Sequence, residues 1–228
     1  MATTLRYVGT PTRRIDAPDK LRGVELFAAD VDLPGLLHAR LVTSPHASAR
    51  IVAFDAAAAR AVPGVVAVYG GDDLEPLWRE RPAPPPLALN RASYYGQRVA
   101  IVVAETEAIA AEAALLVRIE YAPLPAVLDL EEALRPETPC AVDETMRGGE
   151  AAEALALGPN VAGAYHNRHG DIARGLAEAD LVVTRTYRTR KAHQGYIEPH
   201  ATVAAPDPRG NLAVWTATQA MFFCRDAV

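Results

Sequence analysis

The chain has little cysteine. Its 228 residues include only two, Cys140 and Cys224. An iron–sulfur cluster normally takes four cysteine ligands, so this chain alone cannot build one. A disulfide between the two thiols is the alternative, but such bonds are rare in the cytoplasm, so two independent reduced thiols are favoured.

The chain also lacks long apolar runs and basic clusters. No apolar stretch approaches the roughly 20 residues that span a membrane. The N-terminal residues have no apolar segment of the kind found in a secretory signal, although Arg13 and Arg14 lie together. The net charge is −5 and no Lys/Arg-rich run occurs, which argues against nucleic acid and anionic membrane as partners. We therefore expect a cytoplasmic protein.

What is present is a globular composition, with 50% hydrophobic and 22% charged residues. A chain of this length holds one large or two small domains. The glycines form neither a GxGxxG fingerprint nor a phosphate-binding loop, so nucleotide binding is unsupported.

The stretch around which we expect the rest of the chain to be organised runs from Tyr94 to Asp129. It begins with the continuous apolar run 99–104, typical of a strand buried on both faces. Thr106 is a helix N-cap, and the Ala- and Leu-rich run to Leu116 predicts a helix with Ile109, Ala113 and Leu116 on one stripe. Alternation over 117–121 then indicates a half-exposed strand. We expect both strands to lie in one sheet.

The remaining elements follow from alternation, caps and turn residues. Residues 1–19 form an irregular lead-in, and the proline-rich stretch 72–92 is predicted to be a surface loop. Asp55 and Asp171 cap predicted helices at 55–60 and from 171 to about 179, and a short helix closes at Leu134. A turn at Pro63-Gly64 leads into a predicted strand over 65–69. The other predicted strands, besides those above, cover residues 23–30, 36–43, 49–54, 181–190, 197–204 and 211–218.

Several motifs resemble the large subunit of molybdenum hydroxylases, the family of xanthine dehydrogenase, aldehyde oxidase and aerobic carbon monoxide dehydrogenase. In the first half they are GVELFAADVDLPGLLHARLVTSPHASARI, GQRVAIVVAET and VRIEYAPLPAVLD. In the second half they are GDIARGLAEAD, YIEPHATVA and WTATQAMFF. The resemblance covers residues 7–228 and implies an α+β chain: an α/β hammerhead domain followed by the truncated start of a molybdopterin-binding α+β domain. The expected division is lead-in 1–19, hammerhead 20–135, linker 136–163 and cofactor domain 164–228.

The resemblance also implies one site residue, Gln219. In the family, a glutamine after a strand of this type lies beside the molybdenum and hydrogen-bonds an oxygen ligand of the metal. Gln219 is therefore the one predicted cofactor-binding residue, and we assign no catalytic residue and no metal ligand. The alternative is a surface glutamine that starts a helix. Glu198 matches a family position too, but a structural role through hydrogen bonds is favoured, because a buried carboxylate must be paired.

Other polar clusters carry little chemistry. His166 and His169 are three residues apart, but zinc takes three or four ligands in a compact pattern, so surface histidines are favoured. Ser44 and His46 have no base–acid constellation around them in the sequence to make a nucleophile.

The resemblance implies a molybdenum–pyranopterin cofactor in the complete subunit, with iron–sulfur and FAD on other subunits. The glycine-rich pterin segments of the family, written GGGFGG, do not occur here, nor does the later catalytic glutamate. Two hypotheses follow. The chain is the N-terminal portion of an oxidoreductase that hydroxylates or oxidises an aldehyde, N-heterocycle or similar small substrate with water as the oxygen source, inactive alone. Alternatively, it is a non-catalytic hammerhead assembly module or a component of a split subunit.

Overall fold

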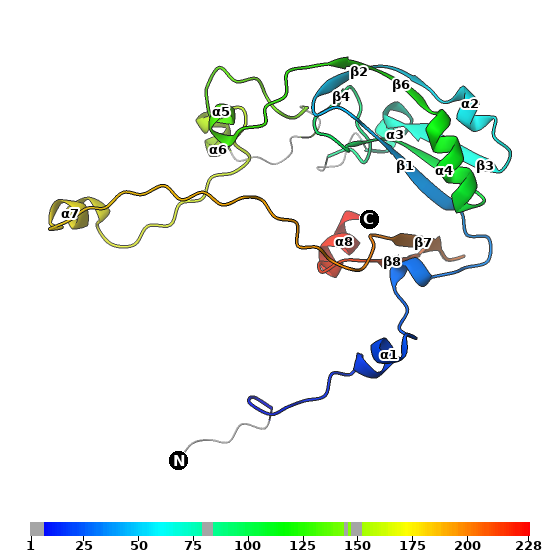
Figure 1. The fold of residues 1–228 in the computed structure, drawn as a ribbon, viewed down its shortest axis with the longest axis horizontal. Coiled ribbons are helices and arrows are strands. Elements are labelled where there is room, and N and C mark those ends of the chain that lie inside the picture. The colour runs from blue at the N-terminus through cyan, green and yellow to red at the C-terminus, as the bar shows by residue number, and fades with distance from the viewer. Residues whose placement is uncertain (1–6, 79–83, 144–145, 147–151) are drawn as a thin grey trace. The chain divides into compact units, whose positions relative to one another are not determined.

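The computed structural model describes residues 7–78, 84–143, 146 and 152–228. It divides into two compact units. The larger unit is Gly35–Val183, and the smaller combines Met1–Pro34 with Thr184–Val228 (Figure 1). The four-part domain division expected from the sequence stays a prediction.

The larger unit contains two three-stranded antiparallel sheets. In the first sheet β5 lies between β1 and β3, and in the second β2 lies between β4 and β6. Both sheets are built from segments far apart in the sequence. The strands are β1 (His38–Thr43), β2 (Ala49–Asp55), β3 (Val65–Gly70), β4 (Arg91–Ala92), β5 (Arg98–Ala104) and β6 (Arg118–Pro123).

Strand β5 is the centre of the larger unit, as its apolar run predicts. Val99, Ala100, Val102 and Ala104 are buried. Its inner face contributes Val102 to a core cluster with Ala56, Ala59, Val68 and Ala113. This doubly buried strand is confirmed, although its neighbours run antiparallel.

Helix α4 (Glu107–Leu116) follows β5, and the Thr106 hydroxyl accepts a hydrogen bond from the Ile109 amide at 3.3 Å. The predicted helix and cap are confirmed, but the expected apolar stripe is only partly right. Ala110 and Ala113 are the buried residues, and Leu116 is 39% exposed. Small side chains let the helix backbone approach the first sheet closely.

The expectation that the strands before and after this helix lie in one sheet is wrong. Strand β5 lies in the first sheet and β6 pairs with β2 in the second. The helix therefore crosses from one sheet to the other. A strand–helix–strand pattern fixes the local elements but not the partner that each strand finds, because pairing is a non-local interaction.

A bulge in β2 aims two apolar side chains in the same direction. Ile51 pairs with Tyr121, but Ala53 pairs with Glu120, so the register shifts by one residue. In a regular strand Ile51 and Phe54 would point to opposite faces, since they are three residues apart. The extra residue in the bulge restores them to one side.

The proline-rich segment is not entirely a loop. Residues Gly71–Trp78 form helix α3 with Pro76 inside it, and the Asp73 carboxylate accepts a hydrogen bond from the Gly70 amide at 2.7 Å. This bond from a backbone amide to a side chain three residues later is one half of a capping box and stabilises the start of the helix. Residues 79–83, with Pro82, lie outside the described part of the chain.

A connector follows β6. It contains α5 (Leu130–Ala133), which confirms the predicted short helix and is capped by the Asp129 carboxylate. It also contains α6 (Ala152–Leu157), which the sequence analysis missed. Arg91 on β4 donates to the carbonyl oxygens of Cys140 at 3.1 Å and Ala141 at 3.3 Å. These bonds tie the connector to the second sheet.

Helix α7 (Ile172–Ala177) begins after Asp171, whose carboxylate accepts from the Arg174 amide at 2.9 Å. This cap is confirmed. The strand predicted at 181–190 is absent: the segment is exposed and carries no regular structure. Alternating β-branched residues stabilise a strand only when a neighbouring strand pairs with it.

The smaller unit contains α1 (Ala17–Arg22), the 3₁₀ turn η1 (Ala28–Asp30), an antiparallel hairpin and a C-terminal helix. The hairpin strands are β7 (Thr202–Pro206) and β8 (Leu212–Thr216), and the helix is α8 (Met221–Ala227). The hairpin prediction is confirmed with β7 starting later than expected. The strand predicted at 23–30 is wrong: its last residues form η1, closed by a bond from the Phe27 amide to the Asp30 carboxylate.

Candidate functional site: the turn after the second hairpin strand

Gln219 lies in the short turn between β8 and α8, as the sequence predicts. Its side chain is exposed and makes no hydrogen bond within the described residues. The amide therefore presents two N–H donors and one acceptor with no competing partner from this part of the chain.

The turn around Gln219 is closed by its neighbours. The Thr218 hydroxyl oxygen accepts a hydrogen bond from the Ala220 amide at 3.0 Å, the side chain-to-backbone contact of a Ser/Thr turn. It also accepts from the Cys224 thiol at 3.3 Å, which links the turn to the first turn of α8. The sequence analysis did not single out Thr218; a threonine three residues before a helix is the signal that could have found it.

The strand that leads to Gln219 is itself fixed within the hairpin. The hydroxyls of Thr202 and Thr216 lie 2.8 Å apart across the two strands, and the Ala217 amide donates to Ala201 O at 3.3 Å. At the other end, the Asp207 carboxylate accepts from the amides of Arg209 and Asn211 at 2.8 and 2.9 Å. The Asn211 side-chain amide donates to the same carboxylate and is the main cause that lowers the pKa of Asp207 from its ordinary value; the backbone amides lower it further.

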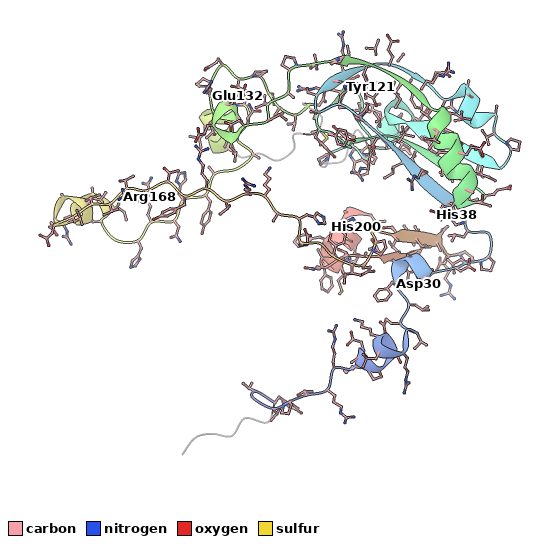
Figure 2. All side chains as sticks on the ribbon, viewed as in Figure 1. Asp30, His38, Tyr121, Glu132, Arg168 and His200 are labelled. Carbon is pink, nitrogen blue, oxygen red and sulfur yellow. The ribbon has the colours of Figure 1, made fainter. Side chains whose placement is uncertain are left out.

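A ring cluster precedes the hairpin. The rings of Tyr196 and His200 stack at 4.5 Å, and the Tyr196 hydroxyl lies 3.3 Å from His200 Nδ1 (His200 is labelled in Figure 2). Glu198 is half-buried and makes no hydrogen bond within the described residues, so the local bonds expected for it are not formed. His166 and His169 are exposed. Across the described ranges no three His, Cys, Asp or Glu residues are grouped as a metal site requires.

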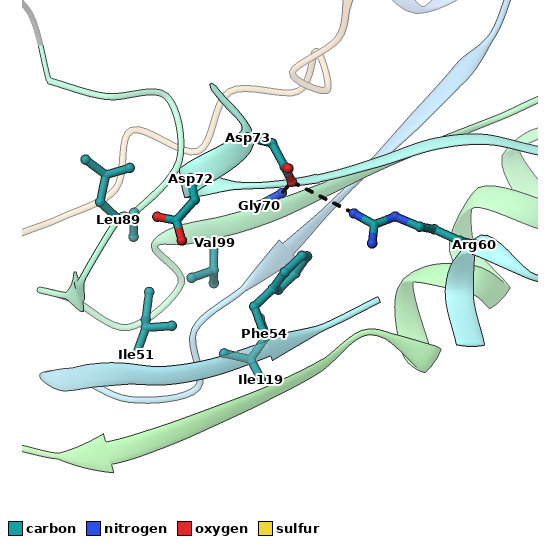
Figure 3. Close-up of a pocket in the computed structure, with 11 residues that line it drawn as sticks. Ile51, Phe54, Arg60, Gly70, Asp72, Asp73, Leu89, Val99 and Ile119 are labelled. Carbon is teal, nitrogen blue, oxygen red and sulfur yellow. Dashed lines mark hydrogen bonds and ion pairs between the residues drawn. The ribbon is translucent and has the colours of Figure 1, made fainter. Parts of the chain in front are cut away.

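A hollow of about 320 Å³ lies in the larger unit between the two sheets (Figure 3). Ile51, Phe54 and Ile119 line it from the second sheet, and Gly70 and Val99 from the first. At its rim Arg60 lies 3.9 Å from Asp73 and donates to Val68 O at 2.9 Å. Both charged groups therefore bond to neighbouring parts of the chain near the start of α3. We interpret the hollow as a result of how the two sheets pack.

Ser44 and His46 form a local turn instead of a nucleophile. The Ser44 hydroxyl accepts from the His46 amide at 3.1 Å and donates to the His46 carbonyl at 3.3 Å, while the His46 ring meets the Tyr121 ring edge-on at 5.0 Å. The Tyr121 hydroxyl is buried without a well-aligned hydrogen bond in the described residues. Burial raises the pKa of Tyr121, and the nearby Ser44 hydroxyl offsets part of that rise.

Comparison with known protein families matches two domains. Residues 22–125 match the aldehyde oxidase and xanthine dehydrogenase a/b hammerhead domain, and residues 156–228 match the molybdopterin cofactor-binding domain. Among solved structures, a Cu,Mo-CO dehydrogenase shares 29% sequence identity over 96% of this chain with a TM-score of 0.76. Quinoline 2-oxidoreductase from Pseudomonas putida 86 shares 31% over 96% with a TM-score of 0.74. These matches define a chain of the molybdopterin hydroxylase class. Within that class, the chain belongs to the large subunits of the xanthine dehydrogenase, aldehyde oxidase and carbon monoxide dehydrogenase family.

The chain spans only part of these relatives. It is 36% identical to the 6-hydroxypseudooxynicotine dehydrogenase complex subunit gamma of Paenarthrobacter nicotinovorans, over 92% of this chain and 27% of that protein. Against the nicotinate dehydrogenase large molybdopterin subunit of Eubacterium barkeri it is 29% identical, over 100% of this chain and 51% of that protein. In the described residues no helix is long and apolar enough to cross a membrane.

The donor chemistry of the turn fits a molybdenum–pterin group. Such a group presents oxygen and sulfur acceptors, and Gln219 offers an exposed amide with no other partner in the described residues. The fit of this chain rests on that one residue, since the sequence contains no glycine-rich pterin segment.

Proposed function

We propose that this chain is the N-terminal portion of a molybdenum hydroxylase large subunit. The complete enzyme is an oxidoreductase that hydroxylates or oxidises an aldehyde, N-heterocycle or similar small substrate, with water as the oxygen source. The observation that carries the proposal is the side-chain amide of Gln219, which has no hydrogen-bond partner among the described residues and lies in a turn closed by Thr218, within the stretch 156–228 that matches the cofactor-binding domain.

In this proposal Gln219 binds the cofactor. Its amide N–H would donate a hydrogen bond to an acceptor on the molybdenum centre and so help to orient the cofactor. The molybdenum, when bound, supplies the two-electron oxidation. The hammerhead domain (residues 22–125) contributes no reacting group in this proposal.

The proposed partners are the remainder of the molybdopterin subunit, an iron–sulfur subunit and an FAD-binding subunit that receive the electrons, and a small-molecule substrate. The proposed location is the cytoplasm. Exposed apolar side chains support assembly with further polypeptide: Met221 and Phe222 are each 67% exposed and Phe223 is 81% exposed, more than a surface helix of seven residues normally presents.

The test of this function is Gln219→Ala in the complete, metal-replete complex. A hydrogen bond to a charged acceptor contributes about 1.5–3 kcal/mol. If the bond strengthens in the transition state, its loss slows turnover roughly ten- to a hundredfold. Molybdenum content and melting temperature stay at wild-type values. Gln194→Ala, which changes another exposed glutamine of the same unit, is the control and keeps wild-type turnover. Wild-type rates from a metal-replete Gln219→Ala complex would refute the role of Gln219.

A second measurement separates the enzyme portion from a non-catalytic assembly module. The chain alone should show no hydroxylase turnover and no visible absorption from flavin or iron–sulfur. Combined with the remaining subunit segments and partner subunits, it should restore turnover. A complex that assembles, binds molybdenum and turns over equally well without residues 164–228 supports the assembly module instead.

A further inference from the structure

We propose that Thr218 is a positioning residue that fixes the direction of the Gln219 side chain. The inference rests on the proposed function, because Gln219 is the residue whose aim matters there. Thr218 itself touches neither cofactor nor substrate in this proposal. It acts through the geometry of the turn.

The first step is the closure of the turn. The Thr218 hydroxyl oxygen accepts from the amide of Ala220 at 3.0 Å, so the two residues on either side of Gln219 are joined to each other. Closing this ring restricts the backbone dihedrals of Gln219, and the backbone in turn restricts which side-chain rotamers are allowed. The Gln219 side-chain amide, which makes no hydrogen bond within the described part of the chain, thereby gains a preferred direction.

The second step is the attachment of the turn to rigid elements on both sides. Toward α8, the Cys224 thiol donates to the same Thr218 oxygen at 3.3 Å, and the Cys224 amide donates to Ala220 O at 3.0 Å. Toward β8, the Ala217 amide donates to Ala201 O across the hairpin. The Thr218 oxygen thus accepts hydrogen bonds from both the turn and the helix.

The energetic scale fits a positioning role. A single neutral hydrogen bond contributes little net stability, so loss of the Thr218 hydroxyl leaves the hairpin folded. A displacement of Gln219 by a fraction of an ångström is enough to weaken a hydrogen bond whose strength depends steeply on distance and angle. The effect should therefore fall on turnover more than on stability.

The test compares Thr218→Val with Thr218→Ser and with a matched control on the same strand. Valine keeps the branched shape and loses the hydroxyl, whereas serine keeps the acceptor. Thr216→Val is the control, since it removes a hydroxyl that bonds Thr202 across the hairpin and leaves the turn closed. In the chain itself, without cofactor, the side-chain amide NMR signals of Gln219 should shift and broaden in Thr218→Val and stay at their wild-type positions in Thr218→Ser and Thr216→Val.

In the complete enzyme, Thr218→Val should lower kcat about three- to tenfold, with KM and molybdenum content unchanged, and Thr218→Ser should restore kcat. The double variant Thr218→Val/Gln219→Ala should be no slower than Gln219→Ala alone, because Thr218 acts only through Gln219.

Additive losses, or Gln219 signals that do not move in Thr218→Val, overturn the positioning role. If those signals move as expected but Gln219→Ala turns over at the wild-type rate, the proposed function fails and Thr218 is left with no catalytic consequence. If Thr218→Val does not fold, Cys224→Ala removes one donor to the same oxygen and should shift the Gln219 signals in the same direction; unchanged signals then overturn the inference.

Discussion

The backbone of Gly71 passes directly beside the carbonyl oxygen of Ala88: a Cβ at position 71 would lie 2.3 Å from that oxygen. The segment that holds Ala88 cannot retreat easily. The Ala88 amide donates to Arg98 O on β5 at 2.8 Å. Two residues later, Asn90 O accepts a hydrogen bond from the Ile51 amide on β2 at 2.9 Å. This contact closes one end of the space between the two sheets, so Gly71 is required by close approach of two backbones.

Gly71→Ala should therefore destabilise the chain by about 2 kcal/mol, the scale of overpacking at a site that cannot relax. Chemical denaturation measures the change. Gly163→Ala is the matched control, because nothing lies within 4 Å of a Cβ there, and it should alter stability by less than about 0.5 kcal/mol. Equal stability of the two variants would show that Gly71 and Ala88 are not in contact.

Ala110→Pro tests helix α4. Ala110 is buried in the middle of the helix, and proline there removes a backbone hydrogen bond and clashes with the preceding turn. The expected loss is about 3 kcal/mol or more. Ala108→Pro is the control: it falls in the first turn, where the amide has no helical partner and proline is tolerated. An unchanged melting temperature for Ala110→Pro would contradict the helix.

Arg91→Met tests the attachment of the connector. The substitution removes the guanidinium bonds to Ser48 Oγ at 2.9 Å and to the carbonyls of Cys140 and Ala141. We expect a loss of about 2–3 kcal/mol, since these bonds involve a charged donor, and faster proteolysis in the connector. Arg50, the pairing partner of Arg91 in the ladder, is exposed, so Arg50→Met should leave both stability and cleavage rate near wild type.

Tyr121→Phe tests the alkaline stability of the second sheet. Because burial raises the pKa of Tyr121 in the folded chain, the folded state favours the neutral phenol. Its contribution is fully present below the unfolded pKa of about 10 and is lost as pH rises through the higher folded pKa. Denaturation between pH 8 and 11 should show wild-type stability falling above pH 10, and a shallower fall for Tyr121→Phe. Tyr165→Phe, at a phenol that is 88% exposed, should follow the wild-type curve.

At pH 7 the Tyr121→Phe chain should be as stable as wild type, within about 1 kcal/mol. Among the described residues the hydroxyl has no well-aligned partner, so removing it breaks few hydrogen bonds. A large loss at neutral pH would reveal a strong hydrogen bond at this hydroxyl instead.

Short-range features were determined by the sequence alone. The Thr106 cap and helix α4, the buried run of β5, the Asp171 cap and the tight turn of the β7–β8 hairpin all depend on residues within a few positions of one another. Local propensity and hydrogen bonding decide such elements, so their prediction succeeded. The motifs that identify the family are equally local, and they placed Gln219 at the end of a strand.

The tertiary structure decided everything that depends on distant partners. It assigned β5 and β6 to different sheets, used a bulge to bring Ile51 and Phe54 to one side, and tied Arg91 to carbonyls about fifty residues away. It also left 181–190 without a strand, because alternation supplies a face but not a pairing neighbour.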